Sequence, residues 1–150
     1  MTSNQNLPYE LHNDEGEIFQ SMGALVSIKA TSEQTRGVFN LFEVLCPPGF
    51  STSHHIHYCE DVAIYVLEGA LTFFLGIENK VAFAGSFSYH PRCTPHGFRV
   101  AGESSARILY ITIPAGFDQF VKEQQQPNQN HVPGTVAALY KIEILGPLPE

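Results

Sequence analysis

The sequence lacks several features that define large classes of proteins. It has no tryptophan, only 15% charged residues, and no apolar run near the ~18 residues that a membrane span requires. Its eight basic residues form no cluster and the formal net charge is −7. This composition argues against nucleic acid or an anionic membrane as a partner, because phosphate binding needs a basic patch. The 43% of hydrophobic residues also excludes the low-hydrophobicity composition of a disordered chain.

Cysteine is scarce as well. The three cysteines, Cys46, Cys59 and Cys93, are odd in number and show no CxxC spacing. The N-terminal segment lacks the basic and apolar regions of a secretory signal. Together these features predict a reduced, cytoplasmic protein without structural disulfides. The length of 150 residues is sufficient for one domain with its own core.

Short runs rich in β-branched and aromatic residues are abundant between Ala24 and Pro114. They are separated by glycine, proline, serine or asparagine at intervals typical of a sandwich or barrel, and none has sustained helical periodicity. They are ALVSIKA, GVFNLFEVL, VAIYVLEG, ALTFFLG, SFSYH, HGFRV and ARILYITI. The sequence therefore predicts an all-β barrel or jelly roll.

The two ends of the chain differ from this β-rich part. Residues 1–20 are polar and are expected to form a loose N-terminal arm, which leaves residues 21–150 as a single domain. After Pro114, the spacing of Phe117, Phe120 and Val121 predicts a short amphipathic helix. Thr135 precedes VAALYKI as the candidate N-cap of a second short helix.

Five of the seven histidines lie between positions 54 and 96. In an extended chain His55 and His57 project from the same face, and such a pair can chelate a transition metal. His96 follows Pro95 at the entry to HGFRV. His54 has the opposite parity, and His90 precedes a proline and is expected to face outward.

The segments around these histidines resemble the two motifs of the cupin superfamily, G(X)5HXH(X)3,4E(X)6G and G(X)5PXG(X)2H(X)3N. The matching residues are Gly49, His55, His57, Gly69, Gly85, Pro91 and His96. IYVLEGALTFFLG and ITIPAGFDQFVKE are also similar to small single-domain cupins described as quercetin 2,3-dioxygenase-like. The resemblance implies a cupin double-stranded β-helix, a jelly-roll barrel, with short C-terminal helices.

The resemblance also implies a function. His55, His57 and His96 would bind a divalent transition metal (Fe, Mn, Ni, Cu or Zn), and a small aromatic or enol substrate, flavonol-like, would be oxidised by dioxygen. Val62 stands where the longer motif gap places the glutamate ligand. Glu60 and Asp61 are therefore candidates for a substitute ligand or a catalytic base.

Three further expectations concern the barrel and its surroundings. If Val62 faces inward, so do Ile64 and Val66, which makes one cavity wall apolar. A core of aromatic side chains is expected at Phe73, Phe74, Phe87, Tyr89 and Phe98. Exposed sheet edges and the N-terminal arm predict a homodimer.

The departures from the motifs leave a second functional class open. Val62 replaces the glutamate, Cys93 the glycine and Val100 the asparagine. A non-catalytic barrel that binds a small ligand through a degenerate metal site is the alternative to a dioxygenase.

Overall fold

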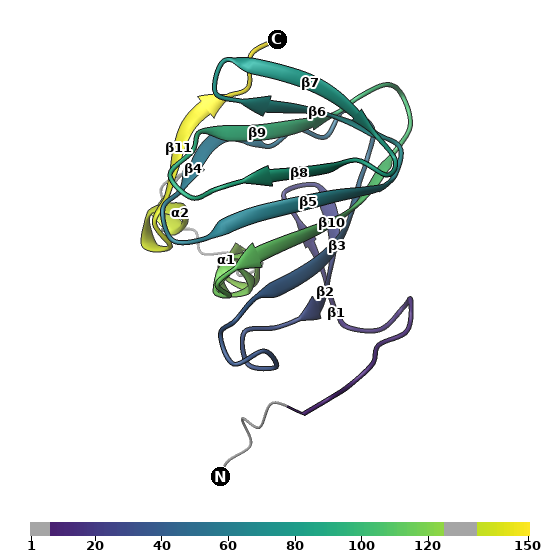
Figure 1. Cartoon of the computed structure of the whole chain (residues 1–150), viewed down its shortest axis with the longest axis vertical. Helices are drawn as coiled ribbons and strands as arrows, with labels where there is room; N and C mark the ends of the chain where they lie inside the picture. The colour runs from purple at the N-terminus through teal and green to yellow at the C-terminus, as the bar shows by residue number, and fades with distance from the viewer. Residues whose placement is uncertain (1–6, 125–134) are drawn as a thin grey trace.

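The computed structural model describes residues 7–124 and 135–150 and consists mainly of two antiparallel β-sheets that face each other (Figure 1). One sheet has the strand order β1-β2-β3-β10-β5-β8. Its strands are β1 (Glu17–Ser21), β2 (Ala24–Ala30), β3 (Asn40–Cys46), β10 (Ala106–Ile113), β5 (Asp61–Glu68) and β8 (Phe87–His90). The other sheet has the order β11-β4-β9-β6-β7. Its strands are β11 (Ile142–Pro147), β4 (Ser53–His57), β9 (His96–Val100), β6 (Ala70–Leu75) and β7 (Glu78–Phe83).

Alternating burial along the strands explains how the two sheets close on one core. In β2 and β3 every second residue is buried, as expected for a strand with one face against the interior. On β5, Val62, Ile64 and Val66 are buried, so all three face inward as expected, but of these only Ile64 lines the main cavity of the described part of the chain. The all-β class and the jelly-roll architecture predicted from the sequence are therefore confirmed.

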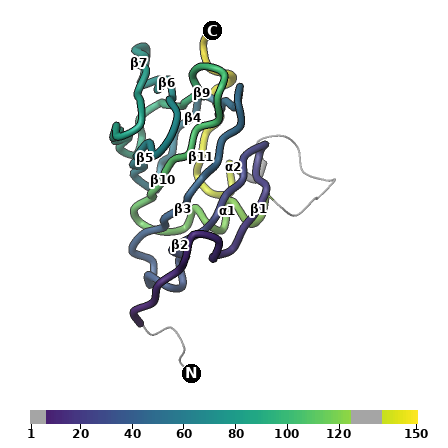
Figure 2. The backbone as a smooth tube through the Cα atoms, turned by 90° about the vertical axis from the view of Figure 1, so that its right-hand side faces the viewer, coloured from purple at the N-terminus to yellow at the C-terminus, as the bar shows by residue number. Residues whose placement is uncertain are grey.

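Two short helices lie together with β11 at one end of the barrel (Figure 2). They are α1 (Phe117–Gln124) and α2 (Thr135–Leu139), close to the positions predicted. Asn40 anchors the start of α1, because its Oδ1 accepts hydrogen bonds from the backbone N–H groups of Gly116 at 3.0 Å and Asp118 at 3.2 Å. This anchor turns Phe120 and Val121 toward the interior, where both are buried.

Two strands and two side chains differ from the sequence expectations. Residues 17–20 of the expected arm, together with Ser21, form β1, which pairs with β2, and β11 near the C-terminus pairs with β4. Residues 1–6 lie outside the described part. Phe87 and Tyr89 are 62% and 53% exposed on the outer face of β8, so their expected place in the core is wrong. Side chains alternate between the two faces of β8, and His90 faces inward, so Phe87 and Tyr89 face outward.

No helix in the described part of the chain is long and apolar enough to cross a membrane.

Candidate metal centre

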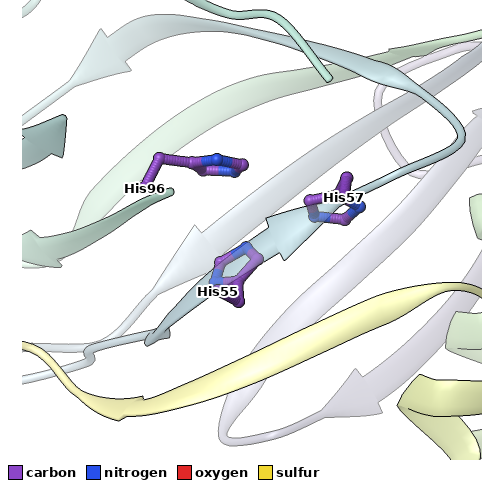
Figure 3. Close-up of side chains that lie close together, drawn as sticks. All are labelled: His55, His57 and His96. Carbon is purple, nitrogen blue, oxygen red and sulfur yellow. The ribbon is translucent and has the colours of Figure 1, made fainter. Parts of the chain in front are cut away.

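Three histidines from two neighbouring strands meet inside the barrel (Figure 3). His55 and His57 project from β4, and His96 begins β9 directly opposite His55 in the antiparallel register. The three residues are 8%, 2% and 3% exposed. The ligand atoms that they offer lie within 4.8 Å of one another. Bonds of about 2.0–2.1 Å to one metal ion place two ligand atoms at most about 4.2 Å apart, so the rings would have to move toward the ion.

Hydrogen bonds hold all three imidazole rings by the same ring atom. Nδ1 lies 2.7 Å from the Ser53 carbonyl oxygen in His55, 2.7 Å from Glu60 Oε1 in His57, and 2.9 Å from the Thr94 carbonyl oxygen in His96. Each neighbour is an acceptor, so each Nδ1 carries the proton and donates it. This tautomer leaves the lone pair of every Nε2 free for a metal, the arrangement that ligating histidines generally show.

Two of the rings are held neutral, and one of these is incompletely satisfied. Burial, together with the neighbouring histidines, lowers the pKa of His55 to about 4 and that of His96 to about 2. His96 Nε2 is buried and has no hydrogen-bond partner among the described residues. A buried polar atom without a partner is uncommon, and a divalent transition metal is the partner that a cluster of imidazoles suits best. The residues therefore fit such an ion.

The three histidines lie on the wall of a cavity of about 610 Å³. Its size is typical of small-molecule sites. The remaining wall is mainly apolar, and its side chains include Phe42, Val44, Ile64, Phe98, Ile108, Tyr110, Phe117, Phe120, Val121 and Ile142. Four of these residues were not expected at the site from the sequence: Phe117, Phe120 and Val121 of α1, and Ile142 of β11. The i, i+3, i+4 spacing of the three α1 residues predicted an apolar helix face, and this face could have indicated them.

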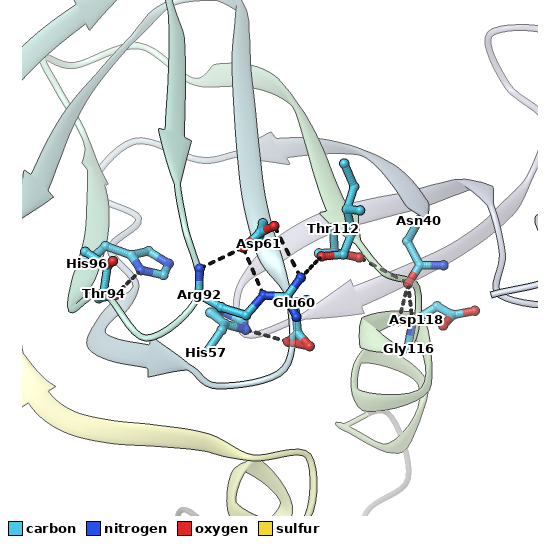
Figure 4. Close-up of polar contacts among 11 residues, drawn as sticks. Asn40, His57, Glu60, Asp61, Arg92, Thr94, His96, Thr112, Gly116 and Asp118 are labelled. Carbon is cyan, nitrogen blue, oxygen red and sulfur yellow. Dashed lines mark hydrogen bonds and ion pairs between the residues drawn. The ribbon is translucent and has the colours of Figure 1, made fainter. Parts of the chain in front are cut away.

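The two candidate carboxylates have separate surroundings (Figure 4). Glu60 is buried, and its Oε1 accepts the hydrogen bond from His57. Asp61 binds Arg92 through the backbone N–H at 2.9 Å and Nε at 3.1 Å, and this pairing lowers the pKa of Asp61. Neither carboxylate lines the cavity of the three histidines. Glu60 thus holds a ring of the site, whereas Asp61 is held by Arg92.

Three other residues singled out in the sequence have defined places. His90 is 1% exposed, and its ring lies 4.6 Å from that of His96, so the expectation that it faces outward is wrong. The expectation came from Pro91, but a following proline only restricts the backbone of His90 to an extended conformation and does not decide where its side chain points. Cys59 and Cys93 are exposed free thiols and do not line the cavity. Cys93 has a φ of 69°, which explains why the motif has glycine there.

We expect Glu60→Gln to weaken metal binding about tenfold and Glu60→Ala up to about 100-fold, the range for losing a ligand's hydrogen-bond partner. Glutamine keeps an oxygen acceptor for His57 Nδ1 but loses the negative charge, whereas alanine loses both. Competition with a chromophoric chelator measures the affinities. Asp61→Asn is the matched control and should change affinity less than twofold. Equal affinities for wild type and Glu60→Ala would contradict this role.

The approach of β9 to β4 depends on Gly97. A Cβ on Gly97 would lie 2.6 Å from Leu148 Cδ2 and 2.7 Å from the Ser53 carbonyl oxygen, both far inside contact distance. Ser53 also binds the ring of His55, so a displaced β9 would disturb both strands that carry the histidines.

We therefore expect Gly97→Ala to lower the free energy of unfolding by about 1–3 kcal/mol, the usual cost of overpacking, and to weaken metal binding as well. Gly76→Ala is the control, since Gly76 has open space around it but a φ of 63°. It should lose stability through backbone strain alone and leave metal affinity unchanged. Chemical denaturation and chelator competition together separate the two effects, and unchanged affinity in Gly97→Ala would contradict the argument.

The molecule is thus a two-sheet β-barrel with three inward histidines that could hold a metal ion, and comparisons with known proteins point to its family. Residues 42–112 match the family described as Cupin domain. The chain is 25% identical over 126 residues, 84% of its length, to quercetin 2,3-dioxygenase of Bacillus subtilis (strain 168), and spans 37% of that protein. Both matches support a cupin superfamily protein.

Solved structures show the same fold. The structure of KdgF from Halomonas sp. matches with a TM-score of 0.67 and 21% identity, over 75% of this chain and 99% of KdgF. The polyketide cyclase RemF from Streptomyces resistomycificus matches with a TM-score of 0.63 and 22% identity, over 71% of this chain and 80% of RemF. These likenesses support the cupin fold alone.

Proposed function

We propose that the protein is a metal-dependent dioxygenase that acts on a small aromatic or enol substrate. The observation that carries the proposal is the set of three imidazoles, each held by a hydrogen bond at Nδ1, on the wall of a mainly apolar cavity. His55, His57 and His96 would hold a divalent transition metal. The similarity to a quercetin 2,3-dioxygenase supports this class of substrate and reaction.

The residues around the cavity would bind and orient the substrate. The metal, when bound, would supply Lewis acidity and redox chemistry toward dioxygen. Apolar side chains such as Ile64, Phe98 and Phe117 suit a planar aromatic or enol compound and exclude water. Because both atoms of dioxygen enter the product, the substrate itself supplies the electrons and no external reductant is required.

Of the two candidate carboxylates, we assign Glu60 to the site. It acts through His57 by fixing that ring, and it makes the imidazole a better electron donor. Asp61 would not serve as the base, since Arg92 binds its carboxylate. The absent motif glutamate leaves three neutral ligands, which favours binding of an anionic enolate oxygen.

The experiment is oxygen uptake by metal-loaded protein with a panel of flavonols and enols. We expect consumption of one dioxygen per substrate, with both labelled oxygen atoms from ¹⁸O₂ in the product. His57→Ala, loaded in the same way, should consume none. Wild-type protein that holds metal but turns over no compound in the panel would overturn the dioxygenase proposal.

Val62 favours the second candidate, a barrel that binds a small ligand without catalysis. Its side chain is fully buried at the position of the motif carboxylate. The test compares wild type with Val62→Glu. If Val62→Glu raises metal affinity, and if both proteins bind flavonols but neither turns them over, the binding function would replace the enzymatic one.

We also propose that the protein is a homodimer. The outer face of β5 and β8 carries exposed aromatic side chains, with Tyr65 opposite Phe87 in the register and Tyr89 two residues further along β8. Contiguous exposed apolar surface favours burial in an interface. Light scattering of wild type at micromolar concentration should give twice the monomer mass. Phe87→Glu should shift the measured mass toward that of the monomer. A monomeric wild type would contradict the proposal.

A further inference from the structure

A fourth histidine faces the barrel interior from the opposite sheet, although it does not line the cavity of the other three. His90 ends β8 and lies directly opposite Val62 of β5 in the antiparallel register. Residues opposite each other in such a pair project from the same face, and both are buried, with His90 1% exposed. A histidine therefore stands one strand away from the position at which the motif carboxylate is replaced by valine.

One ring nitrogen of His90 is held and the other has no partner. Nε2 lies 2.8 Å from the Ser88 hydroxyl oxygen, and Nδ1 is buried without a hydrogen-bond partner among the described residues. A hydroxyl can accept as well as donate, so when Nε2 donates its proton to Ser88, the Nδ1 lone pair is free to ligate a metal. The free atom would then be Nδ1, whereas it is Nε2 in the other three histidines.

The ring of His90 lies beside one member of the cluster, although the group of ligand atoms within 4.8 Å of one another comprises His55, His57 and His96 alone among the described residues. Its centroid is 4.6 Å from that of His96. Within the set His55, His57 and His96 the centroids are 4.5 to 5.4 Å apart. Phe73 packs on the ring at 5.5 Å and helps to fix its place.

We propose that His90 is a fourth nitrogen ligand of the metal and takes over the coordination position that Val62 cannot provide. This inference rests on the proposed metal binding by the other three histidines. The ligand set would consist of four neutral imidazoles, so the metal would keep its full double charge. An enolate, or another anionic oxygen ligand, would then be bound more strongly than in a site with a carboxylate ligand.

Copper(II) is the probe that tests the proposal, because its electron paramagnetic resonance spectrum reports the number of coordinated nitrogens. We expect four nitrogens in wild type and three in His90→Phe. The affinity of His90→Phe for copper(II) and zinc(II) should fall at least about tenfold. The double variant Val62→Glu/His90→Phe should recover affinity while its spectrum shows three nitrogens and an oxygen.

His54→Ala is the matched control. His54 lies on β4 beside His55 but projects from the opposite side of the strand, so its removal should leave both the nitrogen count and the affinity unchanged. Three nitrogens in wild type, with an unchanged affinity in His90→Phe, would overturn the role of His90 and leave the three-histidine site intact. Wild type that binds neither metal would overturn both. The wild-type spectrum decides the question even if His90→Phe does not fold, and His90→Gln provides a second variant.

Discussion

His96→Leu is expected to abolish metal retention and to leave the apo protein as stable as wild type or more stable by about 1 kcal/mol. The ring of His96 is buried, and its Nε2 has no partner among the described residues. Leucine has a similar volume and no polar atom, so it removes an unsatisfied group that costs roughly 1–3 kcal/mol, but it also removes the Nδ1 hydrogen bond to the Thr94 carbonyl oxygen, worth about 0.5–1.5 kcal/mol. With one of the ligands gone, affinity should fall at least about 100-fold, beyond the loss for a supporting hydrogen bond.

Elemental analysis after purification without chelator, together with denaturation of the apo proteins, measures both effects. His12→Ala is the control, because His12 is exposed and pairs with Glu10 on the surface; it should retain metal at the wild-type level. A mutant that keeps its metal would show that His96 is not a ligand. A mutant that loses several kcal/mol as an apo protein would show that His96 is a structural residue whose polar ring the fold requires.

This opposition between stability and function explains why the three ligands could be predicted from the sequence. A pair of histidines at i and i+2 on a strand, and a third at the start of another, are costly in an apolar interior. Their presence in a lightly charged chain therefore indicated chemistry. His55, His57 and His96 meet as the motif resemblance implied.

Glu60 and His90 could not be placed in the same way, because their orientation depends on contacts outside the local pattern. Glu60 precedes β5 in the turn after β4, where strand parity does not apply, and its hydrogen bond to His57 fixes its direction. His90 faces inward because β8 pairs with β5 so that His90 stands opposite Val62. Periodicity within one strand gives the alternation of its side chains but not which set is buried.

The same limit applies to the fold. The long β-rich runs and the helix at Phe117–Gln124 have strong local patterns, and they were found. Strands β1 and β11 do not: β1 is polar, and β11 contains Gly146 and ends at Pro147. Each is a strand because a partner, β2 or β4, satisfies its backbone groups, and such pairing between distant segments leaves little local signal.

Acid is expected to unfold the metal-free protein between pH 6.5 and about 4. Burial is the main cause that lowers the pKa of His55 and His90 to about 4 and that of His96 to about 2. In the unfolded chain these histidines titrate near pH 6.5. Below this pH the unfolded state binds up to three protons that the native state does not, so stability is complete above pH 6.5 and is lost as the pH falls.

The loss should be large, because each proton contributes about 1.4 kcal/mol per pH unit. Three histidines together approach about 4 kcal/mol per unit, against a total stability of about 5–15 kcal/mol for a typical domain. Urea denaturation between pH 8 and 4.5 measures the slope. His90→Phe has one buried imidazole fewer and should show about two thirds of this slope.

Bound metal occupies the histidine lone pairs and should delay the loss of stability until the metal is released. A stability that stays constant from pH 7 to 5 in the apo protein would mean that the histidines already bind protons in the native state, and the cluster would then be too positively charged to attract a divalent ion.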